Sequence, residues 1–195
     1  MADKFNRVCV AGVGLIGGSM ALKMRRLGLA EEIVGVGRTI QNLEDAVKIG
    51  AITSYTQKIE QGVEDADLVI LAVPVKAMPA LVKSACGCFK TSAILTDVGS
   101  TKSSLIKAVE SHLAGLNKKV DFIPAHPIAG REKSGARYSD PEIFNGHWTI
   151  ITPAKSSSKK GIQRIKELWK ALGAKVLLMD PEIHDRILAG VSHLP

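Results

Sequence analysis

Aromatic residues, cysteines and long apolar runs are all scarce in this sequence. Aromatic side chains make up only 4% of the 195 residues, and the basic residues behind the net charge of +7 are spread over predicted helix faces. Basic grooves with interleaved aromatic residues are typical of nucleic-acid binding, so this composition argues against a nucleic-acid partner. We interpret most of the positive charge as solvated helix surface and a smaller part as attraction for an anionic ligand.

The three cysteines, Cys9, Cys86 and Cys88, are an odd number, and C-x-C matches neither a zinc knuckle nor a C-x-x-C redox pair. We expect reduced thiols, with Cys9 buried. The longest apolar run, residues 68–75, is too short to cross a bilayer, and the polar first residues lack the apolar stretch of a signal peptide. The sequence therefore predicts a cytoplasmic protein without a membrane partner.

Hydrophobic residues at 46% and charged residues at 23% are ordinary for a globular protein, and the length suits one α/β domain. Short apolar, β-branched runs alternate with amphipathic stretches along the chain, as strands and helices do in a doubly wound fold. The pattern predicts a mostly parallel Rossmann-type sheet with helices on both faces.

Strands are expected at residues 8–13, 33–36, 68–73, 93–96, 122–124, 149–152 and 176–179. Helices are expected at 16–27, 43–48, 78–89, 103–113 and 162–172, with a final helix that opens at Asp180-Pro181. Thr39 and Asp180 are predicted N-caps, and Gly173 is a predicted C-cap.

The strongest motif is a G-x-G-x-x-G run formed by Gly12, Gly14 and Gly17, between an apolar strand and an amphipathic helix. A dinucleotide-binding fingerprint requires this context. Gly12 would permit the tight turn, Gly14 the approach of a pyrophosphate, and Gly17 the close packing of helix on sheet. The first helical N–H groups, at Leu15 and Ile16, would then bind the phosphates.

The fingerprint also predicts an acidic residue about 20 positions further on, which binds the ribose 2′-hydroxyl of NAD. Gly37 and Arg38 stand there instead. A guanidinium can bind a 2′-phosphate bidentately or stack on the adenine. Arg38 therefore favours NADP, or use of both NADP and NAD, and the less favoured alternative is an exposed loop cation.

The ends of three other predicted strands carry further candidates, because ligands of open α/β sheets bind at that edge. Val73 and Pro74 either line the cofactor cleft or terminate a strand. Ser100 contacts the substrate, caps the helix that begins near Ser103, or does both. His126, held by a following proline just past a strand end, is placed as a general base that is neutral near pH 7. No metal-ligand spacing such as H-x-x-x-H occurs, so no metal is expected.

Five segments, GVGLIGGS, LAVPV, DVGSTK, HPIAGREKSG and the terminal VSHLP, occur in an order and spacing that resemble the prephenate and arogenate dehydrogenases, the TyrA family. The resemblance extends from about residue 7 to residue 195. The G-x-G-x-x-G run alone does not distinguish this family from other Rossmann reductases, whereas HPIAG with E-K-S-G and S-H-L-P is specific.

The resemblance implies oxidation of a cyclohexadienol hydroxyl with loss of carbon dioxide, which gives 4-hydroxyphenylpyruvate from prephenate or tyrosine from arogenate. It implies that His126 takes the catalytic hydrogen bond to that hydroxyl and that Ser100 helps to place it. It also implies substrate-binding roles for Glu132, near the pocket mouth, and for Ser192 and His193 in the S-H-L-P segment.

The family continues after S-H-L-P into a helical domain that provides dimerisation and an arginine for a substrate carboxylate. We therefore expect residues 1–180 to form the dinucleotide-binding domain and residues 181–195 to begin the helix leading to a missing domain, through which a homodimer would form. The chain alone should bind cofactor but catalyse poorly, and its last helix should expose apolar residues. The alternatives are another hydroxyacid-type Rossmann reductase and a dinucleotide-binding module without turnover.

Overall fold

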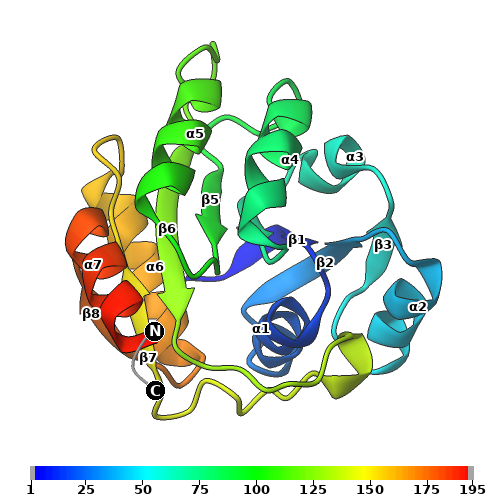
Figure 1. The fold of residues 1–195 in the computed structure, drawn as a ribbon. Coiled ribbons are helices and arrows are strands. Elements are labelled where there is room, and N and C mark those ends of the chain that lie inside the picture. The colour runs from blue at the N-terminus through cyan, green and yellow to red at the C-terminus, as the bar shows by residue number, and fades with distance from the viewer. Residues whose placement is uncertain (1–2, 193–195) are drawn as a thin grey trace.

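The computed structural model describes residues 3–192, in which eight strands form one sheet with helices on both of its faces (Figure 1). The strands are β1 Phe5–Ala11, β2 Ala30–Val36, β3 Ser54–Thr56, β4 Leu68–Leu71, β5 Ile94–Asp97, β6 Asp121–Pro127, β7 Trp148–Ile151 and β8 Lys175–Leu178. The helices are α1 Leu15–Arg26, α2 Ile40–Lys48, α3 Ile59–Val63, α4 Met78–Ala85, α5 Ser103–Leu113, α6 Lys159–Ala171 and α7 Pro181–Ser192, with short 3₁₀ turns η1 Val75–Ala77 and η2 Ala136–Tyr138.

The strand order across the sheet is β3-β2-β1-β4-β5-β6-β7-β8. Among the described strands, β6 and β7 form the single antiparallel pair, and all other neighbours run parallel. The chain leaves β1 toward β2 on one side and returns to place β4 on the other side. This reversal of direction next to β1 is the switch point at which open α/β sheets form their ligand crevice.

Two apolar cores lie on opposite faces of the sheet, one under α1, α2 and α6 and the other under α3, α4 and α5 (Figure 1). Successive side chains of β1 alternate between them: Val8 and Val10 join the first core, and Cys9 and Ala11 join the second. Both faces of the strand are therefore apolar, which explains its uninterrupted hydrophobic sequence. Cys9 is buried as predicted, and its burial raises the pKa of the thiol to about 12.

The predicted fold class is confirmed, and each expected strand and helix is present, most of them with shifted ends and α5 with the predicted bounds. The sequence did not predict β3 and α3, which are short and follow one another at the edge of the sheet. Asp180 caps α7 as predicted, since its Oδ1 accepts hydrogen bonds from the backbone N–H groups of Glu182 (2.9 Å) and Ile183 (3.1 Å). Thr39 occupies the N-cap position of α2, but its side chain makes no capping hydrogen bond within the described residues.

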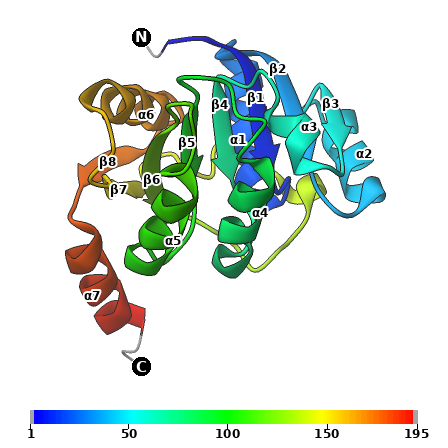
Figure 2. The same cartoon turned by 90° about the horizontal axis from the view of Figure 1, so that it is seen from above.

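Helix α7 contacts the start of α5 through Asp185 and otherwise extends beyond the sheet (Figure 2). Ile183 and Ile187 on α7 are 48% and 46% exposed, as expected for the apolar residues of this helix. The division into domains at residue 180 stays a prediction. The helices of residues 3–192 are all too short or too polar to cross a lipid bilayer.

Candidate functional site

The carboxyl ends of β1, β4, β5 and β6 lie along one edge of the sheet, and most of the predicted site residues follow these ends. They are Gly12, Gly14 and Gly17 after β1, Val73 and Pro74 after β4, Ser100 after β5, and His126 near the end of β6. Arg38 follows β2 at the same edge. The fold thus brings together residues that are up to 114 positions apart in the sequence, from Gly12 to His126.

The three glycines of the turn after β1 have different structural roles. Gly12 has a φ of +98°, and a Cβ atom there would collide with the carbonyl oxygen of Ala72. A Cβ atom on Gly17 would collide with the carbonyl oxygen of Gly12, so these two glycines allow the turn, α1 and the end of β4 to touch. A Cβ atom on Gly14 would meet nothing within 4 Å in the described part of the chain.

The open space over Gly14 is where a dinucleotide pyrophosphate fits. Gly14 is the N-cap of α1, and no side chain of the described residues caps this end of the helix. No acidic residue occupies the first turn of α1, so the first N–H groups, including those of Leu15 and Ile16, are left for an anion. The cradle formed by Gly12 and Gly17 therefore fits the dinucleotide that the motif implies.

Next to this turn, Val73 is half-buried with its Cγ1 close to Gly12, while Pro74 is exposed and precedes η1. Arg38 is exposed, and its backbone carbonyl accepts a hydrogen bond of 2.6 Å from Nε2 of Gln57. Gln57 thus holds the loop that presents Arg38 at the end of β2.

The N-terminus of α5 is capped from α7 rather than by Ser100. The carboxylate of Asp185 accepts hydrogen bonds from the backbone N–H groups of Lys102 and Ser103, each 2.8 Å long. Ser100 is exposed and lies before the helix, so the capping alternative for Ser100 is wrong, while its role with a substrate stays a prediction. A cap from a residue 83 positions away has no local sequence signal.

A fully buried ion pair between Lys102 and Asp97 lies at the carboxyl ends of β5 and β6. The ammonium of Lys102 bonds to the carboxylate of Asp97 and donates a second hydrogen bond of 2.8 Å to the carbonyl of Ala125. Burial raises the pKa of Asp97 and lowers that of Lys102, and each charge opposes the shift in the other. Sequence reasoning missed Lys102, although a lysine five residues after a strand-end aspartate was an available signal.

His126 lies within β6, one residue before its end, rather than just past the strand as predicted. Its ring is half-buried, and its Nδ1 lies 2.9 Å from Nε2 of His184. Burial, with smaller contributions from His184 and Lys102, lowers the pKa of His126 to about 4, against an opposing effect of Asp185. His126 is therefore neutral at pH 7, which a general base requires.

His184 is fully buried on α7, and its Nδ1 lies 2.9 Å from Oδ1 of Asp185. His184 was not predicted as a site residue because it lies on the apolar stripe of the last predicted helix, where a histidine is usually part of the core. The acidic neighbour that follows it was the available signal. The three groups form a row rather than a cage, and the described residues contain no group of three side chains suited to hold a metal ion.

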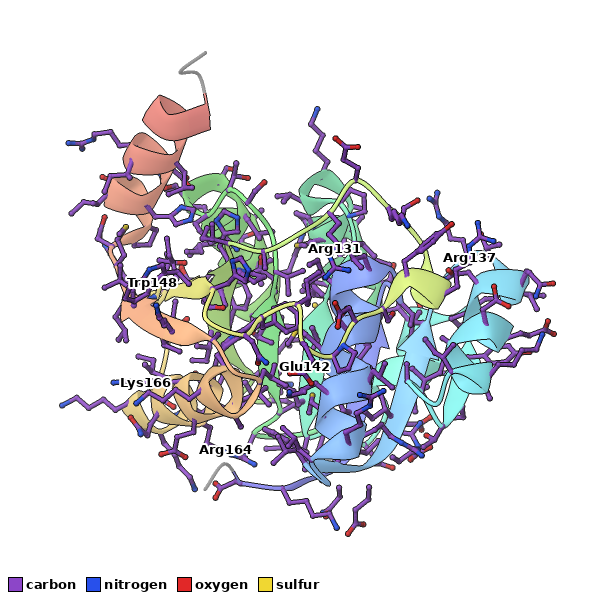
Figure 3. The ribbon with its side chains drawn as sticks, turned by 90° about the horizontal axis from the view of Figure 1, so that it is seen from below. Arg131, Arg137, Glu142, Trp148, Arg164 and Lys166 are labelled. Atoms are coloured by element: carbon purple, nitrogen blue, oxygen red, sulfur yellow. The ribbon has the colours of Figure 1, made fainter. Side chains whose placement is uncertain are left out.

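The loop at residues 128–147 carries Glu132 and crosses α1 on its way to η2 and β7 (Figure 3). Figure 3 shows Arg131 and Glu142 near α1, and these side chains pair with Asp140 (2.6 Å) and Lys23 (2.8 Å), respectively. Glu132 itself is exposed. The Arg131–Asp140 pair thus closes the loop around Glu132 and η2, and the Lys23–Glu142 pair ties the loop to α1.

Asn42 of α2 connects this loop to the glycine-rich turn. Its Oδ1 accepts a hydrogen bond from the backbone N–H of Ala136 (2.8 Å), and its Nδ2 donates one to the carbonyl of Val13 (2.7 Å). No motif singles out Asn42, since both of its partners are backbone groups that only the fold brings near. Ser192 ends α7, and its side chain lies outside the described residues, as does all of His193.

Comparison with known proteins adds independent findings. A family model described as "Prephenate dehydrogenase, nucleotide-binding domain" matches residues 20–178. A prephenate dehydrogenase of Bacillus subtilis is 31% identical over 189 residues, which are 96% of this chain and 50% of that protein. A cyclohexadienyl dehydrogenase of Zymomonas mobilis is 32% identical over 193 residues, which are 98% of this chain and 64% of that protein.

Solved structures show the same likeness. Prephenate dehydrogenase from Aquifex aeolicus, in complex with hydroxyphenyl propionate and NAD+, superimposes with a TM-score of 0.87 at 34% identity, over 96% of this chain and 64% of that one. Synechocystis arogenate dehydrogenase superimposes with a TM-score of 0.87 at 26% identity, with the same coverage of 96% and 64%. The chain spans about half to two thirds of the length of these relatives.

Proposed function

Since the chain belongs to the prephenate dehydrogenase family, we propose that it forms the cofactor-binding part of an enzyme that oxidises prephenate or arogenate with NAD or NADP in tyrosine biosynthesis. The observation that carries this proposal is the neutral His126 at the sheet edge that also holds the glycine-rich turn. A relative was solved with both NAD+ and hydroxyphenyl propionate, and another is named for arogenate.

The glycine-rich turn and the start of α1 bind the pyrophosphate of the cofactor, with N–H groups of Leu15 and Ile16 directed to it. Val73 and Pro74 line the cleft beyond the turn. Arg38 lies at the end of β2, where an acidic residue would select NAD, so we propose use of NADP or of both cofactors. When bound, the nicotinamide supplies the acceptor for the hydride.

His126 accepts the hydrogen bond of the substrate hydroxyl and Ser100 helps to place that hydroxyl, so both act at the reacting carbon. As the carbon–hydrogen bond breaks, His126 holds the hydroxyl proton. The carboxylate leaves as carbon dioxide, its bonding electron pair enters the ring, and the proton returns to the oxygen of the phenol product. Glu132, Ser192 and His193 contribute substrate contacts, and a homodimer forms through a region beyond this chain.

Turnover tests the proposal most directly. The whole enzyme of which this chain forms the cofactor-binding part is assayed for NADH or NADPH formation with prephenate and with arogenate. His126→Ala is expected to lower kcat by about 10²–10⁴-fold, the range typical of a lost general base. The exposed His147 supplies the control variant His147→Ala, which should leave kcat unchanged. Because the pKa of His126 is about 4, kcat/KM should fall only as the pH drops through about 4, where the base becomes protonated.

Three outcomes would contradict the proposal. Equal kcat for His126→Ala and its parent removes the base from the mechanism. Turnover of a simple hydroxyacid, but not of prephenate or arogenate, favours another Rossmann reductase. Binding of NADH or NADPH by a protein that turns over neither substrate favours a dinucleotide-binding module.

A further inference from the structure

A row of three hydrogen-bonded side chains leads from the surface of α7 to the ligand edge. Asp185 Oδ1 lies 2.9 Å from Nδ1 of His184, and Nε2 of His184 lies 2.9 Å from Nδ1 of His126. The two rings meet edge to face, with planes at 69° and centroids 5.1 Å apart, so the nitrogens face each other rather than stacking. His184 is fully buried, which leaves its ring nitrogens only these partners in the described part of the chain.

The charge at the outer end of this row decides where the protons lie. Burial alone would raise the pKa of Asp185, but hydrogen bonds from Ser103, His184 and Lys102 hold the pKa below its usual value. Asp185 is therefore an ionised carboxylate, which only accepts hydrogen bonds. Nδ1 of His184 must then be the donor, and in the neutral form of this ring no second proton is left, so Nε2 of His184 is an acceptor.

The tautomer of His184 determines that of the His126 ring. Because Nε2 of His184 accepts, Nδ1 of His126 carries the proton, and Nε2 of His126 keeps its lone pair. A free neutral imidazole prefers the opposite tautomer, with the proton on Nε2. Without the row, the nitrogen available to a substrate would therefore be occupied by a proton for most of the time.

We propose that His184 and Asp185 are positioning residues that fix His126 as the Nδ1–H tautomer, so that its Nε2 is ready to accept the proton of the substrate hydroxyl. The role of the free Nε2 rests on the proposed function, whereas the tautomer itself does not. The charged groups around His126 are the carboxylate of Asp185 on α7 and the ammonium of Lys102, whose charge is balanced by Asp97.

The fold holds the row in place through the start of α5. Asp185 accepts two backbone hydrogen bonds there, and Ser103 Oγ donates a third bond, of 3.1 Å, to the carbonyl of Pro181 at the start of α7. The first turn of α7 is therefore fixed against α5 although the rest of the helix extends beyond the sheet (Figure 2). Such outer partners commonly set the tautomer and orientation of a histidine that does chemistry.

Long-range ¹H–¹⁵N NMR correlations of the imidazole rings of the labelled chain test the tautomer directly at pH 8. We expect the His126 signals of an Nδ1–H ring in the parent chain and in the control variant His147→Gln. His184→Phe keeps a ring in the buried site but removes the acceptor, so the Nε2–H tautomer should become the major form of His126. An Nε2–H ring at His126 in the parent chain would overturn the proposal whether or not any variant folds.

Steady-state kinetics of the enzyme, with prephenate or arogenate as the substrate, provide the second readout. His184→Phe should lower kcat by about 10–100-fold and change the substrate KM by less than about twofold, because the base is misprotonated while the binding contacts remain. Asp185→Asn should have a smaller effect in the same direction. An unchanged kcat in His184→Phe would overturn the positioning role. Absence of turnover in the parent would instead overturn the proposed function and leave the NMR result standing.

Discussion

The two sides of the ligand edge are built in different ways. The glycine side, residues 12–17, is shaped by backbone alone: two glycines allow close contacts, and the third leaves open space. The histidine side, formed by Asp97, Lys102, His126, His184 and Asp185, consists of buried or half-buried polar side chains from distant segments. The residues of the first side all lie in one short run of chain that packs against Ala72, whereas the second side exists only once β5, β6, α5 and α7 have come together.

This difference predicts where each side is vulnerable. A substitution on the histidine side leaves a buried charge or polar group without its partner, which is costly. A substitution on the glycine side acts through steric contact, and its cost depends on which glycine is changed. Stability should therefore respond most to the histidine side, and cofactor binding most to the glycine side.

The largest expected effect is on the buried ion pair. Lys102→Met keeps the length of the side chain but leaves the Asp97 carboxylate buried and unpaired, so the free energy of unfolding should fall by about 3–5 kcal/mol. Urea denaturation measures it. Lys107→Met, at an exposed position of α5, the helix that follows Lys102, is the matched control and should change stability by less than about 0.5 kcal/mol. Equal stability of the two variants would show that the ion pair does not hold the histidine side together.

A smaller effect should separate two glycines of the same turn. Gly12→Ala forces a side chain into a positive φ and against the carbonyl of Ala72, so it should destabilise the chain by roughly 1–3 kcal/mol. Gly14→Ala meets no obstacle among the described residues and should leave the melting temperature unchanged. Its methyl group should nevertheless weaken NADH binding by about tenfold, which corresponds to about 1.4 kcal/mol.

Thermal melts and fluorescence titrations with NADH measure both effects. If Gly14→Ala binds NADH as tightly as its parent, the space over Gly14 is not the pyrophosphate site. If Gly12→Ala melts with its parent, the close contact with β4 does not constrain the turn.

The smallest expected change concerns the choice between cofactors. Arg38→Asp should shift the ratio of NADPH to NADH affinity toward NADH by about tenfold, since a charge-assisted hydrogen bond contributes about 1.5–3 kcal/mol. Lys48→Asp makes the same charge change at an exposed position on α2 and should leave the ratio unchanged. Titration of both cofactors measures the ratio. A parent chain that binds both equally, with no shift in Arg38→Asp, would assign Arg38 to the solvated surface.

The contrast also explains what the sequence could predict. The glycine-rich turn is readable because its three glycines lie within residues 12–17 and are flanked by an apolar strand and an amphipathic helix. His126 could be placed at the edge because a proline follows it at the end of an apolar run. By contrast, β3 is a polar three-residue strand whose pairing with β2 comes only from the fold.

The row of Asp185, His184 and His126 could not be predicted from separate segments of the sequence. His184 is 58 positions from His126, and the apolar stripe of the final helix predicts a core residue there. Asp185 caps a helix that begins more than 80 residues earlier, so Ser100 was the nearer candidate on local grounds. Such contacts depend on where α7 lies against α5, and neither periodicity nor a spacing rule specifies that.

The burial of Cys9 has a practical consequence for chemical labelling. A thiol with a pKa of about 12 in the centre of the sheet supplies almost no thiolate at pH 8, and reagents cannot reach it. Alkylating reagents will therefore modify only Cys86 and Cys88, near the end of α4, while the chain is folded. The rate at which Cys9 is modified therefore measures how often the central strand opens. That opening requires loss of the whole nucleotide-binding fold rather than local fraying.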